Sequence, residues 1–88
     1  MKPIRREKEI KNMSKDYLSI GGSFFPKKEI LSIEKIILGN SIYVSIKTQR
    51  TKFLIDFGVN EEFNSAIVDD CIIAFRENLE NFRKNMKN

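Results

Sequence analysis

The sequence contains no histidine and only one cysteine among its 88 residues. The lack of histidine removes the commonest general base, every zinc site that needs histidine and every histidine-containing catalytic triad. A single cysteine excludes an internal disulfide and a cysteine-cluster metal site, and this fits a reducing cytoplasm. Because Cys71 stands among Ile67, Ile72 and Ala74, we expect a buried, inert thiol and not a nucleophile.

Several sequence motifs are missing as well. No apolar run reaches the roughly 18 residues of a membrane-spanning helix, and no apolar segment follows the basic stretch Met1–Ile10 as it would in a secretory signal. Gly21 and Gly22 lack the lysine of a phosphate loop and indicate a turn. Asp69 and Asp70 are neighbours that point about 100° apart on a helix, which favours a solvated face over a shared metal. We therefore expect no enzyme, cofactor, metal or small-molecule substrate.

Length and charge predict one small domain with a basic arm. A chain of 88 residues with 41% hydrophobic and 32% charged residues is typical of one globular unit with a modest core. Residues 1–16 and residues 17–60 each carry six Lys/Arg against three Asp/Glu, whereas residues 61–88 carry four against six. A basic excess attracts nucleic acid, anionic lipid or an acidic protein, or it serves solubility alone. We expect an arm over 1–16 and a single α+β domain over 17–88.

The strongest pattern predicts one long C-terminal helix over about 61–87, with Asn60 as its N-cap and acidic residues in its first turn. Apolar residues recur there at steps of four and three, which keeps them on one side of a helix. A second, shorter stripe accompanies the first in the N-terminal half, so we expect that half to cover a sheet. The first stripe is Val68, Ile72, Phe75, Leu79, Phe82 and Met86, and the second is Ile67, Cys71 and Ala74.

Strands are expected at about 17–57, as an antiparallel meander of four to five short strands. A Gly21-Gly22 turn joins two short strands, and Gly39-Asn40 is a two-residue loop of the kind found in tight hairpins. Counting back from the turns gives a register in which one face is apolar. That register pairs Ile46 with Phe53, Val44 with Ile55, Ile42 with Phe57, Ile37 with Ile42 and Ile33 with Ile46.

One pair in this register places a charged side chain on the apolar face. It puts Lys35 opposite Val44 on the apolar face, and we expect either a bulge there or an edge position that lets the ammonium reach water. The opposite face carries Tyr43, and Lys47 stands opposite Lys52 at the end of the hairpin.

The arm itself supports two interpretations. Ile10, Met13 and Tyr17 are spaced three and four residues apart, which indicates a short helix from Arg6 to Met13. Because its basic residues are interleaved with glutamates, a solvated terminus is the other interpretation. An arm that folds back through Ile4, Ile10 and Met13 could also cover the end of the long helix.

Two surfaces carry the functional hypotheses. The leading one is a non-catalytic, cytoplasmic binding or regulatory module that acts by protein–protein interaction, including self-association through Leu79, Phe82 and Met86, where the helix should overhang the sheet. The alternative is nucleic-acid binding by the basic hairpin and the arm, with Lys47, Arg50 and Lys52 beside Tyr43. A small inhibitor encoded by a phage or another mobile element would have the same features.

Overall fold

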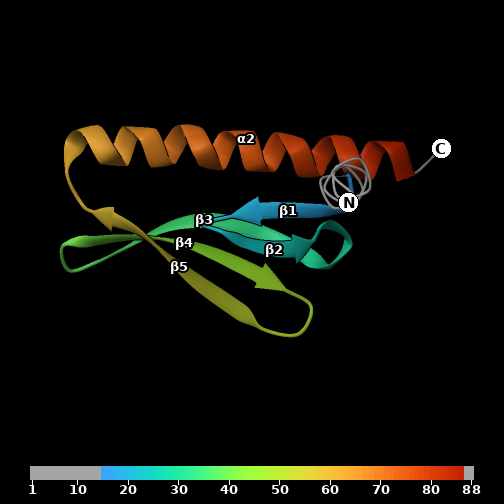
Figure 1. The fold of residues 1–88 in the computed structure, drawn as a ribbon, viewed down its shortest axis with the longest axis horizontal. Coiled ribbons are helices and arrows are strands. Elements are labelled where there is room, and N and C mark those ends of the chain that lie inside the picture. The colour runs from blue at the N-terminus through green and yellow to red at the C-terminus, as the bar shows by residue number, and fades with distance from the viewer. Residues whose placement is uncertain (1–14, 87–88) are drawn as a thin grey trace, which may run out of the picture.

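The computed structural model describes residues 15–86 and shows an α+β fold, in which five antiparallel strands lie on one side of a long helix (Figure 1). The predicted fold class is confirmed. The predicted helix from Arg6 to Met13 and the fold-back of the arm lie outside the described residues. The elements are β1 (Tyr17–Ile20), β2 (Ser23–Pro26), the 3-10 helix η1 (Lys27–Glu29), β3 (Ile30–Leu38), β4 (Ser41–Thr48), β5 (Lys52–Val59) and α2 (Glu62–Met86).

The strands form two sheets, a β1–β2 hairpin and a three-stranded meander in the order β3–β4–β5. The predicted register is confirmed for four apolar pairs, Ile33 with Ile46, Ile37 with Ile42, Val44 with Ile55 and Ile46 with Phe53, and also for Lys35 with Val44. Period-two alternation and two short turns were enough to fix it, since a slip of one residue would turn every apolar side chain to the other face.

The predicted pairing of Ile42 with Phe57 is interrupted by a bulge, where β5 places both Phe57 and Gly58 opposite Ile42. Gly58 has a φ of +106°, and a Cβ there would lie 3.1 Å from the side-chain nitrogen of Asn64. The Gly58 N–H donates to the Asp56 carboxylate at 2.8 Å. The bulge bends the end of β5 toward the start of α2, as an extra residue in one strand does.

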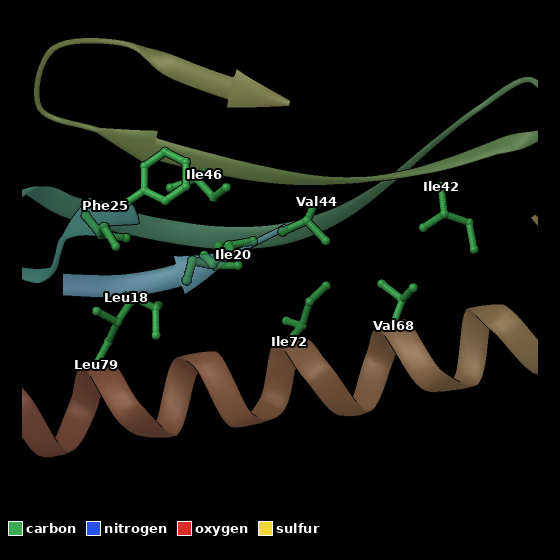
Figure 2. Close-up of a cluster of buried hydrophobic side chains, with 11 residues drawn as sticks. Leu18, Ile20, Phe25, Ile42, Val44, Ile46, Val68, Ile72 and Leu79 are labelled. Atoms are coloured by element: carbon green, nitrogen blue, oxygen red, sulfur yellow. The ribbon is translucent and has the colours of Figure 1, made fainter. Parts of the chain in front are cut away.

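The core lies between α2 and the strands (Figure 2). Ile42, Val44 and Ile46 are fully buried under the helix and the hairpin, and Val68 and Ile72 of α2 face them. Leu79, further along the helix, packs beside Leu18 of β1. The hairpin therefore extends the covered surface to the second half of α2. The buried apolar residues are Leu18, Ile20, Phe25, Ile30, Ile33, Ile42, Val44, Ile46, Val68, Ile72 and Leu79.

Two expectations about α2 are wrong. The N-cap position is held by Glu61, because its carbonyl accepts the bond from the Ser65 N–H, while the Asn60 N–H donates to the Asn40 carbonyl at 2.6 Å. The second stripe does not cover the sheet, since Ile67 and Ala74 are exposed and Cys71 is half-buried. The helix makes its apolar contact through one stripe and uses a polar row on its other flank.

That polar row fixes α2 to the outer edge of β3. Lys35 is on the covered face and its ammonium lies 2.9 Å from both the Ser65 hydroxyl and the Asp69 carboxylate. Of the two alternatives expected at Lys35, the bulge is absent and the edge position is confirmed, because β3 is an edge strand. The ammonium is held by the helix, with a quarter of the side chain exposed. The long stem lets the charge leave the apolar layer. Asp69 is thus an ion-pair partner and not merely part of a solvated face.

Two arginines continue the row toward the C-terminus. Arg76 donates to the carbonyl of Ile33 at 2.9 Å, and Arg83 donates to the carbonyl of Ile30 at 2.5 Å. β3 is an edge strand of its sheet, and edge strands carry backbone groups without a partner strand. The arginines bond to the carbonyls of Ile30 and Ile33, so the helix covers part of this edge. Ser65, Asp69, Arg76 and Arg83 recur at steps of four, seven and seven, which places them on one flank of the helix.

A matched pair of substitutions tests the buried face. Ile42 and Ile37 are directly opposite each other, but Ile42 is 0% exposed and Ile37 is 46% exposed. Ile42→Ala should lower the free energy of unfolding by about 2–5 kcal/mol, because it leaves a cavity in the core. Ile37→Ala should cost less than half of that. Both residues lie on the same face of the sheet, so the pair tests how far the covered area extends. Urea denaturation followed by circular dichroism measures both losses, and equal losses would contradict the burial of Ile42 alone.

A double-mutant cycle tests the polar row. Lys35→Met, Asp69→Ala and the combined variant should give a coupling free energy of about 0.5–1 kcal/mol, since the pair is partly open to water. Lys35→Met alone should be near neutral, because an apolar side chain of similar length suits the covered face. A coupling of zero would show that the Lys35–Asp69 contact does not stabilise the fold in solution.

Candidate interaction surfaces

The end of the β4–β5 hairpin carries the predicted basic patch. Lys47 is directly opposite Lys52, as the turn length predicted, and Arg50 lies in the turn between them. The Thr48 hydroxyl holds the turn, since it donates to the Thr51 carbonyl at 2.9 Å and accepts from the N–H groups of Arg50 and Thr51. All three basic side chains are exposed, and within residues 15–86 none of them forms an ion pair.

Tyr43 lies apart from this patch. It is half-buried on the same sheet face as Lys47, but four residues along β4, or about 13 Å at ~3.3 Å per residue. Its direct cross-strand neighbours are Ile36 and Asp56. The four candidate nucleic-acid residues therefore do not form one cluster.

Aromatic rings do gather beside Arg50, on the other side of the hairpin end. A crevice of about 400 Å³ separates the β1–β2 hairpin from the β4–β5 hairpin. Phe25 and Phe53 meet edge to face in it, with ring centroids 5.2 Å apart. Phe24 is 53% exposed and Phe53 40% exposed. We call this site the aromatic crevice, and its main lining residues are Phe24, Phe25, Phe53, Ile55, Glu29 and Arg50.

Backbone contacts join the two hairpins that line the crevice. The Gln49 N–H donates to the Glu29 carbonyl at 3.1 Å, which ties the β4–β5 turn to η1. Gly21, at a φ of +59°, packs so closely on Ile55 that a Cβ at this position would clash with the isoleucine side chain. The sequence does not predict this site, because no local pattern indicates how one hairpin packs on another. The Phe24-Phe25 pair next to Pro26 was the only available signal.

The outer side of α2 carries a second seam that runs beside the buried stripe. Each member precedes a buried-stripe residue by one position, so the seam lies about 100° around the helix. None of its side chains is charged. Ile67 and Ala74 are exposed, and Phe63, one turn before Ile67, is 75% exposed. The outer seam is Ile67, Cys71, Ala74, Asn78, Asn81 and Asn85.

The predicted interface at the end of α2 requires a correction. Leu79 is only 4% exposed, because β1 covers it, so it offers no area to a partner. Phe82 is half-buried, and the ammonium of Lys27 lies 5.5 Å from its ring centroid. Lys27 itself is buried, and a cation over an aromatic face stabilises such a position. Met86 is exposed. The helix overhangs the sheet less than expected, since the β1–β2 hairpin lies beneath its second half.

Asn78, Asn81 and Asn85 line a cavity of about 780 Å³ together with Lys15 and Asp16. The polar half of the outer seam thus lies where the described chain begins. Among residues 15–86, the lining of this cavity does not include the apolar half of the outer seam, toward the start of α2.

Residues 15–86 contain no group of three or more His, Cys, Asp or Glu side chains placed to hold a metal ion. Cys71 is half-buried, less covered than expected. Within the same residues, no helix has the length and apolarity needed to cross a membrane. Comparisons with protein-family models, with curated proteins and with solved structures find no match to this chain.

The two exposed rings of the crevice should differ in their effect on stability. Phe53→Ala should lower the free energy of unfolding by about 2 kcal/mol, less than for a fully buried Phe, because it removes the edge-to-face contact with Phe25. Phe24→Ala should change it by less than about 0.5 kcal/mol, as is usual for surface sites. Chemical denaturation measures both, and a larger loss for Phe24→Ala would contradict this arrangement.

Proposed function

We propose that the protein is a small non-catalytic binding module of the cytoplasm that acts by protein–protein interaction, with a second copy of itself as the partner. The observation that carries the proposal is the exposed, uncharged apolar surface on the first half of α2, formed by Phe63, Ile67, Cys71 and Ala74. Monomeric proteins rarely leave contiguous apolar patches in water, and such patches mark interaction sites.

The spacing of this surface supports a helix–helix contact. Phe63, Ile67, Cys71 and Ala74 follow one another at steps of four, four and three, the spacing by which apolar helix faces are recognised. Cys71 and Ala74 are small, so a second helix could approach the backbone closely at these positions. Charged residues on α2 lie outside this stripe, which removes the cost of bringing like charges together.

A two-fold arrangement follows from the order of large and small residues. If two α2 helices cross antiparallel with Ile67 on the symmetry axis, positions equidistant from Ile67 meet. Phe63 of one copy then contacts Cys71 of the other, so the largest exposed ring faces a small side chain twice per dimer. Asp70 of one copy faces Asn64 of the other instead of a second acid.

The size of this contact sets its strength. Burying one Phe side chain is worth roughly 1.5–3 kcal/mol, while association costs at least ~4 kcal/mol in lost freedom of motion. Contacts through one helix fall in the small, transient class of interfaces. We therefore expect a dimer with a dissociation constant of about micromolar or weaker, formed and released readily.

Disulfide trapping tests the two-fold axis. In a Cys71→Ser background, Ile67→Cys should form a disulfide-linked dimer under mild oxidation, because the two thiols would face each other at the axis within the short reach that a disulfide allows. Non-reducing electrophoresis measures the linked fraction. Ile73→Cys in the same background is the matched control, since Ile73 is also exposed but lies about 120° around the helix.

Equal linkage of the two variants, or none for Ile67→Cys, would contradict the proposal. A second measurement uses light scattering over a concentration series. The combined variant Phe63→Ser, Ile67→Ser should have a lower average mass than the wild type at high concentration. Leu54→Ser removes a comparably exposed side chain from the sheet and should leave the mass unchanged. A wild-type protein that stays monomeric throughout would exclude self-association.

A further inference from the structure

We propose that the aromatic crevice binds single-stranded nucleic acid, with a base inserted beside Phe24 and Phe53 and the sugar–phosphate chain passing over the basic end of the β4–β5 hairpin. This function uses a different surface from self-association, and it does not depend on it. The crevice lies between the two hairpins, whereas the proposed dimer contact lies on the outer face of the first half of α2.

The aromatic rings of the crevice are suited to stacking with nucleic-acid bases. Phe24 and Phe53 line one crevice and both keep a large part of their surface exposed. Exposed aromatic side chains in a groove are the stacking platforms on which single-stranded nucleic acids place their bases. The crevice volume of about 400 Å³ lies within the range of ligand-binding pockets. The edge-to-face contact of Phe25 with Phe53 holds one ring in place before any ligand arrives.

The polar lining of the crevice offers hydrogen-bonding groups for a nucleobase. Arg50 and Glu29 both line the crevice. A guanidinium donates to carbonyl and ring-nitrogen acceptors of bases, and a carboxylate accepts from their exocyclic amines. An apolar floor that carries one donor and one acceptor group matches the edge of a nucleobase, whereas a purely hydrocarbon ligand would use neither polar group.

The hairpin end beside the crevice carries positive charge that a phosphate could neutralise. Lys47 and Lys52 are directly opposite each other on the outer face at the same hairpin end, and like charges so placed repel one another. A phosphate near this hairpin end would relieve the repulsion. Arg50 adds a third positive charge in the turn between them. Together they give the hairpin end a positive potential that attracts a polyanion, although Glu29 offsets part of it.

Fluorescence anisotropy with a labelled single-stranded oligonucleotide of mixed sequence, about 12 nucleotides long and thus within the range of known site sizes, tests the proposal. Phe24→Ala should weaken binding by about 5- to 150-fold, the effect of losing one stacked base. Phe63→Ala is the matched control, because it removes an exposed phenylalanine from α2 and should leave the affinity unchanged. Unfolding measurements on both variants show that the fold is retained.

The salt dependence gives a second, independent result. Binding should weaken steeply between about 50 and 200 mM salt, and Lys52→Ser should reduce the slope of log affinity against log salt by about 0.7, the value for one phosphate contact on a single strand. Lys84→Ser removes a positive charge outside the crevice and should leave the slope unchanged. The basic arm is present in every variant, so its contribution cancels in each comparison.

Three outcomes would overturn the proposal. The first is the absence of binding at low salt. The second is an equal loss for Phe24→Ala and Phe63→Ala, which would show that the rings of the crevice have no special part. The third is displacement of the oligonucleotide by polyglutamate of the same total charge as effectively as by unlabelled oligonucleotide, which would assign the site to acidic proteins. None of these results bears on the disulfide test of self-association.

Discussion

The packing of the apolar stripe of α2 on the strands sets which way the helix faces, and polar contacts with the outer edge of β3 support that orientation. Lys35 bonds Ser65 and Asp69 near one end of the helix, and Arg76 and Arg83 bond backbone carbonyls of β3 toward the other. These contacts lie on one flank of the apolar stripe, so the helix has little freedom to roll about its axis. Because its orientation is set, Val68, Ile72 and Leu79 enter the core, while Phe63 and Ile67 face outward.

The polar row also protects the sheet. An edge strand with unpaired backbone groups invites another strand to add to it, and here the helix supplies arginine donors to Ile30 and Ile33. The other edge, β5, is handled differently. Its end carries the bulge at Gly58, and the Asn64 side chain donates to the carbonyls of Phe57 and Val59. Both edges are thus modified by residues of α2, which favours association through side chains over association by strand addition.

The β1–β2 hairpin shapes both proposed surfaces. It lies beneath the second half of α2 and buries Leu79 against Leu18, which moves the exposed apolar surface of the helix to its first half. Its other strand brings Phe25 against Phe53 and contributes Phe24 to the lining, and so forms the aromatic crevice. A small hairpin of four-residue strands would be marginal alone. Its packing on β5 and α2 gives it the fixed position that a binding site requires.

The sequence by itself determined the local structure of this protein. Period-two alternation and short turns determined the pairing of Ile33 with Ile46 and of Val44 with Ile55, and the four–three spacing determined α2 and its buried stripe. Tertiary structure alone decided the partner of Lys35, the burial of Leu79 and Lys27, and the meeting of Phe25 with Phe53. The physical reason is that alternation and helical spacing repeat within one element and can be read along the chain. The polar contacts of α2 with β3 and the docking of one hairpin on another depend instead on residues 20 or more positions apart, such as Gln49 with Glu29 and Lys35 with Ser65. No periodic pattern in the sequence predicts such contacts.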